Sequence, residues 1–331
     1  MTWRQQGRRL CRWLLLLLPL AGCAPGEDDG TISFDNETVT IVIPYRPGGG
    51  FDRAVRAFAP YYARELGTDV NILPENLPGA GGRRAATKVY RARPDGTTLG
   101  IFNLPGFVLP EILGEPVDYD LRELSWIGRI ESQRYVLLAA ATSDIRTLDD
   151  VRALPEVTFL STGYGSSVLA AMQIMAEELG LADPDPIYLT GYPGTADVLV
   201  GLVRGDGNLS ITPVSTALKY VESGDLRAIA IAGGDSNIEG VPTFAELGYP
   251  GLMALDVQRS LAGPPAMEPG LLEFMRAAFM RAVTDPEFEA MAARARLELA
   301  PLDGAATAAA VSGHYTFYEA FKTNLTNPNA R

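Results

Sequence analysis

The feature that most constrains this chain is a pair of glycine-rich segments, each directly after a short β-branched run. The two segments are Pro44-Tyr45-Arg46-Pro47-Gly48-Gly49-Gly50-Phe51-Asp52 and Asn76-Leu77-Pro78-Gly79-Ala80-Gly81-Gly82. Glycine lets backbone N–H groups turn toward a ligand without obstruction by a Cβ atom. Each segment precedes an amphipathic stretch, and a helix N-terminus adds unpaired donors and partial positive charge. The pair therefore predicts a pocket that holds an anion by its main chain.

Short apolar runs alternate with helical patterns along most of the chain. Within each run the residues are apolar without alternation with polar ones, which is typical of parallel strands covered on both faces. Residues 53–66 and 167–179 each place apolar side chains on one helical stripe. This alternation predicts a doubly wound α/β architecture, in which ligands bind beyond the carboxyl ends of the strands. The predicted strands are residues 39–43, 70–73, 97–102, 135–141, 157–160, 186–189, 209–212 and 226–231.

The C-terminal part has a different pattern. Strand signals stop after Gly263-Pro264-Pro265, and residues 269–282, 285–296 and 304–322 are predicted to be consecutive helices. Asp285-Pro286 and Asp303-Gly304 are typical helix starts. Because 331 residues exceed the usual size of a single core, we expect two domains. The helical block is expected to pack back on the first of them.

The first 22 residues have the pattern of an export signal. Four arginines precede a short apolar run that ends in small residues before Cys23. The run is shorter than the ~20 apolar residues of a membrane span, so we expect no transmembrane anchor. Leu20-Ala21-Gly22-Cys23 resembles the lipobox of bacterial lipoproteins and predicts lipidation of Cys23; the alternative is an ordinary signal peptide that contains a cysteine. Residues 23–38 are predicted to be a flexible tether.

Composition argues against several classes of function. The net charge of −12 disfavours a nucleic-acid partner, which needs clustered Lys and Arg. Cys11 and Cys23 are the only cysteines, so the folded part has no disulfide and no thiol nucleophile. His314 is the only histidine, which excludes multi-histidine zinc sites and argues against a Ser-His-Asp triad. We read His314 as a surface or interhelix polar residue and predict no metal and no cofactor.

Three further strings follow the two glycine segments along the chain. They are Pro94-Asp95-Gly96-Thr97-Thr98-Leu99, Thr147-Leu148-Asp149-Asp150, and Gly240-Val241-Pro242-Thr243-Phe244-Ala245-Glu246-Leu247-Gly248-Tyr249-Pro250-Gly251. Together and in this order, the five strings resemble the Bug family, the periplasmic substrate-binding proteins of tripartite tricarboxylate transporters. The resemblance runs from about residue 39 to the C-terminus.

The resemblance implies two α/β domains of periplasmic-binding-protein type that close on a ligand. Carried over, domain 1 comprises residues 39–141 and 260–331, and domain 2 comprises residues 142–259. Residues 135–141 and 259–263 would be the two crossover strands. The C-terminal helical block would belong to domain 1.

The resemblance also implies how a ligand is held. One carboxylate would lie between the two domain 1 loops, and the other end of the ligand would meet two turns of domain 2, each before a helix. The ligand-binding residues expected in domain 1 are Tyr45, Arg46, Gly48, Gly49, Gly50, Asp52, Pro78, Gly79, Ala80, Gly81 and Gly82. Those expected in domain 2 are Gly163, Tyr164, Ser166, Ser167, Tyr192, Gly194 and Thr195.

The chain departs from the family pattern at four positions, one of which, Arg46, is among these expected ligand-binding residues. Arg46 replaces a residue that is usually Pro or Ala, and it either pairs with a carboxylate or is an exposed loop arginine. Pro193 replaces a common Lys, and Asn208 and Thr212 stand where aspartates are frequent. These departures leave the identity of the carboxylate open.

Three polar side chains have two readings each. Ser166 and Thr195 either cap a helix or contact the ligand. Asp52 is more consistent with bracing its own helix than with touching an anion, because like charges repel.

The leading hypothesis is a periplasmic, lipid-anchored solute-binding protein, monomeric and not an enzyme. It would capture a small mono- or dicarboxylate and deliver it to membrane permease subunits. One alternative is a sensor subunit that presents the ligand to a signalling receptor. The other is an exported α/β hydrolase that uses Ser166 or Asp52, although no Gly-x-Ser-x-Gly elbow is present.

Overall fold

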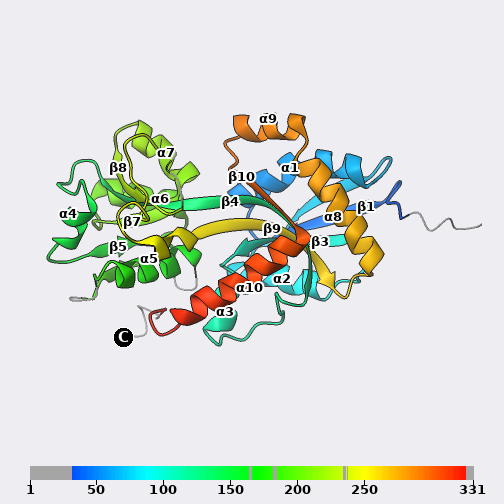
Figure 1. Ribbon diagram of the computed structural model, residues 1–331, viewed down its shortest axis with the longest axis horizontal. Coiled ribbons are helices and arrows are strands. Elements are labelled where there is room, and N and C mark those ends of the chain that lie inside the picture. The colour runs from blue at the N-terminus through cyan, green and yellow to red at the C-terminus, as the bar shows by residue number, and fades with distance from the viewer. Residues whose placement is uncertain (1–31, 164–165, 182–184, 234–235, 237, 326–331) are drawn as a thin grey trace, which may run out of the picture. The chain divides into compact units, whose positions relative to one another are not determined.

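The computed structural model describes residues 32–163, 166–181, 185–233, 236 and 238–325 (Figure 1). The strands are β1 (Thr38–Ile43), β2 (Asn71–Asn76), β3 (Thr98–Leu104), β4 (Leu124–Ala140), β5 (Thr158–Leu160), β6 (Ile187–Leu189), β7 (Ser210–Pro213), β8 (Leu226–Ile231), β9 (Asp256–Pro265) and β10 (Leu299–Asp303). The α-helices are α1 (Gly50–Leu66), α2 (Arg83–Tyr90), α3 (Val108–Ile112), α4 (Leu148–Arg152), α5 (Ser167–Glu178), α6 (Thr195–Arg204), α7 (Val214–Glu222), α8 (Pro269–Val283), α9 (Pro286–Arg294) and α10 (Gly304–Ala320). Two short 3-10 helices are η1 (Ala80–Gly82) and η2 (Pro250–Ala254).

The long strand β4 joins two groups of strands. Its first part, residues 124–134, pairs with β9, and β10 pairs along the same part. Its last part, residues 135–140, pairs with β7 and β8. The first group runs in the order β10-β4-β9-β3-β1-β2, and β5 and β6 form a separate two-stranded sheet. Figure 1 shows β4 and β9 side by side along the length they share.

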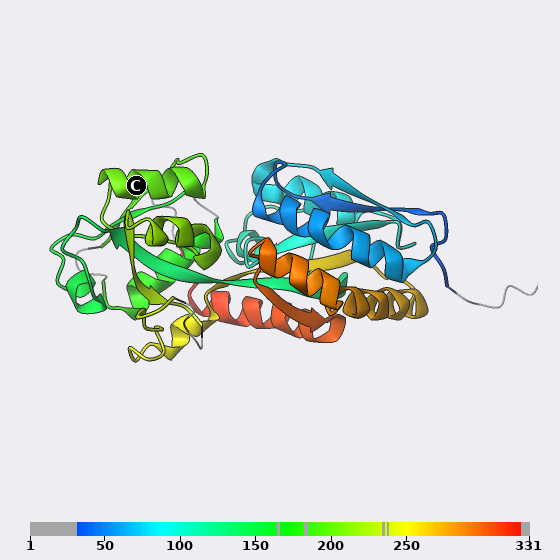
Figure 2. The ribbon, with the colours of Figure 1, turned by 90° about the horizontal axis from the view of Figure 1, so that it is seen from above.

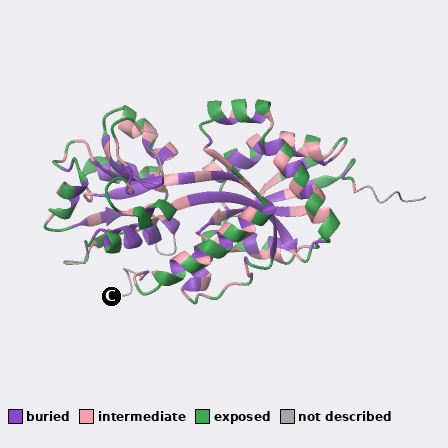
Figure 3. Cartoon of the chain, in the orientation of Figure 1, coloured by how far each residue is buried: buried purple, intermediate pink, exposed green. Residues whose placement is uncertain are grey.

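The α/β architecture is confirmed, but the expectation of parallel strands throughout is wrong. Among the described strands, only β1–β2, β1–β3 and β5–β6 pair in parallel. The pairings of β9 with β3 and β4, and of β4 with β7, β8 and β10, are antiparallel. A continuous apolar run indicates that a strand is buried on both faces, but it does not indicate the direction of its neighbours. Strands of mixed sheets can be buried in the same way as those of parallel sheets. Figure 3 shows β4 and β9 as largely buried.

The helices lie on both sides of the larger strand group (Figures 1 and 2). Helices α1, α8 and α9 contact one another on one side, and α10 contacts α3 on the other. Phe58 of α1 contacts Phe279 of α8 and Phe288 of α9, with ring centroids 5.2 and 5.4 Å apart. Full burial of such a ring contributes about 1.5–3 kcal/mol. The C-terminal helices therefore pack back on the first part of the chain, as predicted.

The predictions for two strands of the larger strand group, β4 and β10, need correction. β4 begins at Leu124 rather than at residue 135, because Glu131 and Gln133 are buried polar residues that interrupt the apolar pattern. β10 was not predicted, because Pro301 interrupts a five-residue strand. Proline is tolerated there because β10 is an edge strand of its sheet.

The chain from Ile32 onward forms one compact unit, so the division into residues 39–141 with 260–331 and residues 142–259 stays a prediction. The end of the predicted tether packs on this unit. Phe34 is buried and stacks on Phe274, with ring centroids 6.2 Å apart. Two residues later, the Asn36 N–H donates to the Thr68 carbonyl. The export signal and Cys23 lie outside the described residues.

Candidate functional site

The two glycine segments leave neighbouring parallel strands at the same level. Ile43 at the end of β1 is opposite Asn76 at the end of β2. The Leu77 N–H donates to the Ile43 carbonyl at 2.8 Å, and Asn76 Nδ2 donates to the Tyr45 carbonyl at 3.0 Å. The structure therefore brings together the two segments that the sequence predicted to share a site.

The first loop is exposed and leads into the N-terminus of α1. Residues 46–49 are exposed, and Gly49 is an extended N-cap with no side-chain cap bond. The first helical bond runs from Arg53 N–H to the Gly49 carbonyl at 3.0 Å. Within the part of the chain that the structure describes, the three preceding N–H groups, those of residues 50–52, have no acceptor. Such a cluster at the positive end of a 17-residue helix favours an anion.

Asp52 braces this loop, in agreement with the reading preferred from the sequence. Its Oδ2 atom accepts from the Gly48 N–H at 2.8 Å and its Oδ1 from Arg56 Nε at 2.9 Å. Burial raises the pKa of Asp52, but hydrogen bonds from Gly48, Asn76 and Arg56 outweigh it and leave the pKa below its ordinary value. The Gly48 N–H is thereby occupied, so the free donors of this loop begin further along, toward α1.

The second loop is held open by four consecutive residues with positive φ. Gly79, Ala80, Gly81 and Gly82 have φ of 132°, 50°, 67° and 98°. A Cβ atom on Gly82 would lie 2.8 Å from Phe107, so this position requires glycine on steric grounds. The side chains of Arg83 and Arg84 donate to the carbonyls of Ala80 and Pro78. The N–H groups of residues 79–81 have no hydrogen-bond acceptor among the described residues.

Tyr45 connects the first loop to β3. Asn103 Nδ2 donates to the Tyr45 hydroxyl at 2.7 Å, and the Tyr45 ring meets Phe51 edge-on with centroids 4.9 Å apart. Burial raises the pKa of Tyr45, and Asn103 and Arg259 offset part of that effect. Asn103 was not predicted from the sequence; its signal is an amide at the end of an apolar strand.

Both serines of the turn before α5 are already hydrogen-bonded. Ser166 caps α5: its Oγ accepts from Leu169 N–H at 3.2 Å and donates to the Gly163 carbonyl at 2.7 Å. Ser167 is buried and accepts from the Tyr135 hydroxyl of β4 at 3.1 Å. The capping reading of Ser166 therefore has direct support. The predicted contact of Tyr164 lies outside the described residues.

The turn before α6 has its hydroxyls arranged differently. The Tyr192 hydroxyl donates to Asp206 Oδ2 at 2.7 Å, beyond the last residue of α6. Gly194, not Thr195, is the N-cap of α6, and Thr195 is the first helical residue. The Thr195 hydroxyl has no hydrogen-bond partner among the described residues, and the side chain is half-buried. Thr195 is thus the hydroxyl in this turn that is available to a ligand.

The family-atypical positions also differ in their surroundings. Arg46 is exposed and makes no ion pair within the described residues. Asn208 accepts from the Thr158 N–H at 2.8 Å and donates to the Glu156 carbonyl at 2.8 Å, so it holds the start of β5. Thr212 is fully buried in β7, where its Oγ1 finds no partner among the residues described.

A buried polar group that sequence reasoning missed lies behind the first loop. Arg259 of β9 forms an ion pair with the fully buried Glu131 of β4 and donates from Nη2 to Gln133 Oε1 at 2.9 Å. The Arg259 Cζ atom lies 4.8 Å from the centroid of the Phe51 ring. The signal in the sequence is a single charged residue within the apolar pattern of β9. Its partners Glu131 and Gln133 are far away in the sequence and become neighbours only after folding.

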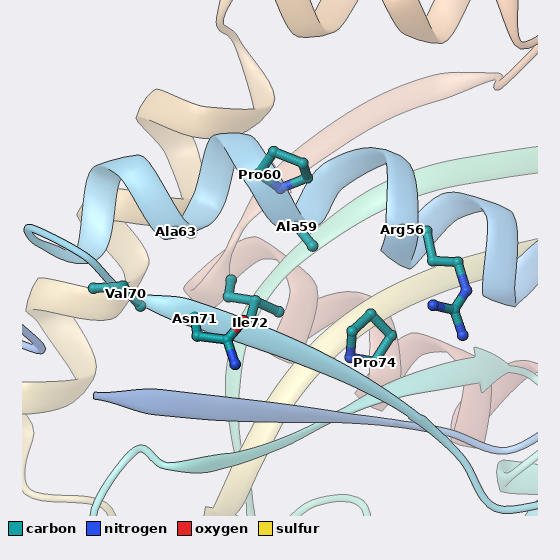
Figure 4. Close-up of a pocket in the computed structure, with 8 residues that line it drawn as sticks. All are labelled: Arg56, Ala59, Pro60, Ala63, Val70, Asn71, Ile72 and Pro74. Atoms are coloured by element: carbon teal, nitrogen blue, oxygen red, sulfur yellow. The ribbon is translucent and has the colours of Figure 1, made fainter. Parts of the chain in front are cut away.

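A groove of about 380 Å³ lies between α1 and the edge strand β2 (Figure 4). None of its lining residues is a predicted ligand residue. Pro74 interrupts the outer edge of β2, as is common where proteins protect an edge strand. We therefore assign this groove to the sheet edge. Its lining residues are Arg56, Ala59, Pro60, Ala63, Val70, Asn71, Ile72 and Pro74.

The residues required by the hydrolase alternative do not combine into a triad. His314 lies on the buried face of α10 and is 7 % exposed, so it is not a surface residue. Burial and Arg129 lower its pKa, and Asp256 raises it. Ser166 donates to a backbone carbonyl and not to an imidazole. In the described ranges, no group of three or more His, Cys, Asp or Glu side chains could hold a metal ion. The same ranges contain no helix that is both long and apolar enough to span a bilayer.

Comparison with known proteins agrees with this geometry. The family model described as "Tripartite tricarboxylate transporter family receptor" matches residues 54–311, well over half of the chain. Protein BugT from Bordetella pertussis is 28% identical over 258 residues, which cover 74% of this chain and 76% of BugT.

Two solved structures share the fold. A TctC solute-binding protein from Polaromonas has a TM-score of 0.72 at 20% identity, covering 86% of this chain and 98% of that protein. MatC from Rhodopseudomonas palustris with bound malate has a TM-score of 0.70 at 24% identity, covering 86% of this chain and 98% of MatC. The expectation of a binding protein and not an enzyme is confirmed by the family. The chain belongs to the tripartite tricarboxylate transporter receptor family of periplasmic solute-binding proteins.

Proposed function

We propose that this protein captures a small carboxylate and delivers it to a membrane permease of the tripartite tricarboxylate type. The observation that carries the proposal is the parallel register of Ile43 and Asn76, which starts both glycine loops side by side. The N–H groups of residues 50–52 and 79–81, which have no acceptor among the described residues, supply donors for such an anion. A solved relative of this fold, MatC, holds malate.

The second end of the ligand would meet the two turns of residues 142–259. Thr195 is the best-placed hydroxyl, since Ser166, Ser167 and Tyr192 already donate or accept in other bonds. Arg46 is exposed beside the first loop and is free to pair with a carboxylate. Closure of residues 142–259 on the other domain would exclude water and strengthen these hydrogen bonds.

The proposal is tested by thermal-shift screening of the full chain against acetate, malate, adipate and citrate, followed by calorimetry. A ligand that binds only the native state raises the melting temperature by mass action. Neutral sugars and cationic amino acids serve as controls. A shift with those controls and none with any carboxylate would refute the proposal.

The loop itself is tested with Gly49→Val. Gly49 is extended at φ −73°, and a Cβ atom there would lie 3.5 Å from the Arg46 carbonyl oxygen, an ordinary contact. The variant is therefore expected to fold and to lose carboxylate binding because the side chain covers the donors. Unchanged affinity would show that the loop is only structural.

We also propose that Cys23 carries a lipid and that the protein acts as a monomer. Labelling with a radioactive fatty acid is expected to mark the wild-type chain and not Cys23→Ala.

A second experiment distinguishes delivery to a permease from presentation of the ligand to a signalling receptor. It compares the uptake of labelled malate by cells with and without the protein. Unchanged uptake together with retained binding would favour the sensor alternative.

A further inference from the structure

Arg259 occupies the centre of three paired strands. It lies opposite Asn103 of β3 on one side and opposite Glu131 of β4 on the other. Only 6 % of the residue is exposed, and its ion-pair partner Glu131 is fully buried. A buried pair of this kind is expected to have its remaining donors satisfied.

The two edges of the guanidinium group face different surroundings. Nη1 and Nη2 bind Glu131 and Gln133 on β4. The edge formed by Nη2 and Nε faces Gly50: a Cβ atom on Gly50 would overlap Nη2 and lie 3.2 Å from Cζ and 3.9 Å from Nε. The absence of a side chain at Gly50 is therefore what lets the guanidinium approach the first turn of α1.

The edge that faces Gly50 carries an unsatisfied donor. Arg259 Nε is buried and has no hydrogen-bond partner within the described ranges, and neither has Asn103 Oδ1. Arg259 is thus a cation, more than nine-tenths buried, whose unpaired Nε lies near the first residue of α1. The N–H groups of residues 50–52 at this helix N-terminus have no acceptor among the described residues either. Each of these groups favours an oxygen acceptor that bears negative charge.

We propose that Arg259 is the specificity-determining residue of the carboxylate site and selects an ionised carboxylate over its neutral amide. The inference rests on the proposed function. Arg259 and the α1 N-terminus attract the same carboxylate, directly or through an ordered water, and Glu131 and Gln133 hold the guanidinium in that orientation. The Glu131 charge limits the attraction, so the pair acts as an oriented dipole and not as a free cation.

The test compares two variants that break the same ion pair from opposite sides. Calorimetry of the full chain with malate, adipate and citrate gives the dissociation constant of each, and melting monitored by circular dichroism verifies the fold. Arg259→Gln is expected to weaken the best-bound carboxylate by about tenfold to a hundredfold, the effect of one charge-assisted hydrogen bond. Glu131→Gln is expected to leave binding unchanged or to strengthen it, because the guanidinium loses its counter-charge.

A purely structural ion pair would move both variants in the same direction, and that result would overturn the proposal. The matched control is Arg129→Gln, which removes a partly buried arginine of the neighbouring strand β4. Arg129 donates from Nε to the Ala300 carbonyl at 2.8 Å, and its variant is expected to bind like the wild type. Should Glu131→Gln not fold, Arg259→Lys and Arg259→Met replace it. The proposal is supported if Arg259→Lys, which keeps the positive charge, still prefers malate over its diamide and Arg259→Met does not. It is overturned if the two variants show the same preference.

Failure of the two proposals can be told apart. If the wild-type chain binds no carboxylate of the panel, the proposed function fails and this inference fails with it. If the wild type binds a carboxylate and Arg259→Gln binds it equally well, only the role of Arg259 is refuted.

Discussion

Asn76 donates from Nδ2 to the carbonyl oxygen of Tyr45 at 3.0 Å, across the gap between the two glycine loops. Its Oδ1 atom accepts from Arg56 Nη2 at 3.1 Å, so the amide is fixed at both ends. One side chain at the end of β2 thus sets the position of the backbone that leads into α1. The two loops are therefore held together twice, by the register of β1 and β2 and by the hydrogen bond of this amide.

Replacing Asn76 by alanine is expected to weaken carboxylate binding and to lower the free energy of unfolding by about 1 kcal/mol, the net value of a typical hydrogen bond. Calorimetry with the best-bound carboxylate and urea unfolding measure the two effects. Asn71→Ala, at the exposed opposite end of β2, is the control and is expected to change neither. An Asn76→Ala variant with wild-type affinity would show that the first loop does not need this tie.

Asp52 is expected to stabilise the protein in a pH-dependent way. The pKa of its carboxyl is below the ordinary value, because hydrogen bonds from Gly48, Asn76 and Arg56 outweigh the effect of burial. A carboxyl whose pKa is lower in the folded state stabilises the protein at pH values above its unfolded-state pKa of about 3.9. This contribution is lost as the pH falls through its folded-state pKa. Asp52→Asn should therefore lower the free energy of unfolding near pH 7 by about 1–3 kcal/mol and progressively less below about pH 4.

Urea unfolding of wild type and Asp52→Asn between pH 2 and pH 8 measures this difference. The exposed Glu37 supplies the control, since Glu37→Gln removes a carboxylate without a comparable set of bonds. A stability difference for Asp52→Asn that stays constant over the whole pH range would contradict the assignment.

The parts of the fold that the sequence predicts well are those with local signals. β1 and α1 follow from a β-branched run, three glycines and an amphipathic stripe. The same holds for the helix starts at Asp285 and Asp303, whose side chains accept from N–H groups of the first turn. The first half of β4 and all of β10 were missed because polar residues and a proline interrupt their patterns, and only the folded partners make those residues acceptable.

The candidate site divides in the same way. The loops at 44–52 and 76–82 are predictable because their glycines and their neighbouring strands are close in sequence. Asn103, Glu131 and Arg259 become neighbours only through the register of three strands far apart in the chain. Composition gives no hint of that register, so the buried polar group behind the loop required the structure.

Gly50 and Gly49 are expected to differ sharply when each is replaced by alanine. A Cβ atom at Gly50 would overlap the Arg259 guanidinium, whereas one at Gly49 makes an ordinary contact of 3.5 Å. Gly50→Ala should lower the free energy of unfolding by about 1–3 kcal/mol, as overpacking commonly does. Gly49→Ala, the neighbouring control, should stay within about 0.5 kcal/mol of the wild type. Equal effects in urea unfolding would show that Arg259 moves aside without cost.

His314 is expected to make the fold sensitive to mildly acidic pH. Burial lowers the pKa of His314 below the ordinary value of about 6.5; Arg129 assists this shift and Asp256 opposes it. Well above pH 6.5 the imidazole is neutral in both states and contributes little to the pH dependence. As the pH falls below 6.5, the unfolded chain binds a proton that the folded chain resists, so stability decreases until the folded pKa is reached.

Because His314 is the only histidine, this dependence can be isolated. Urea unfolding of the wild type between pH 7.5 and pH 5 should show falling stability, and His314→Gln should remove that part of the slope. Proton NMR of the single imidazole gives the folded pKa directly. A titration at or above 6.5, or an unchanged slope in His314→Gln, would contradict the assignment and would mean that the imidazole is charged or solvated on the inner face of α10. The Asp256 carboxylate would then govern its protonation more strongly than burial does.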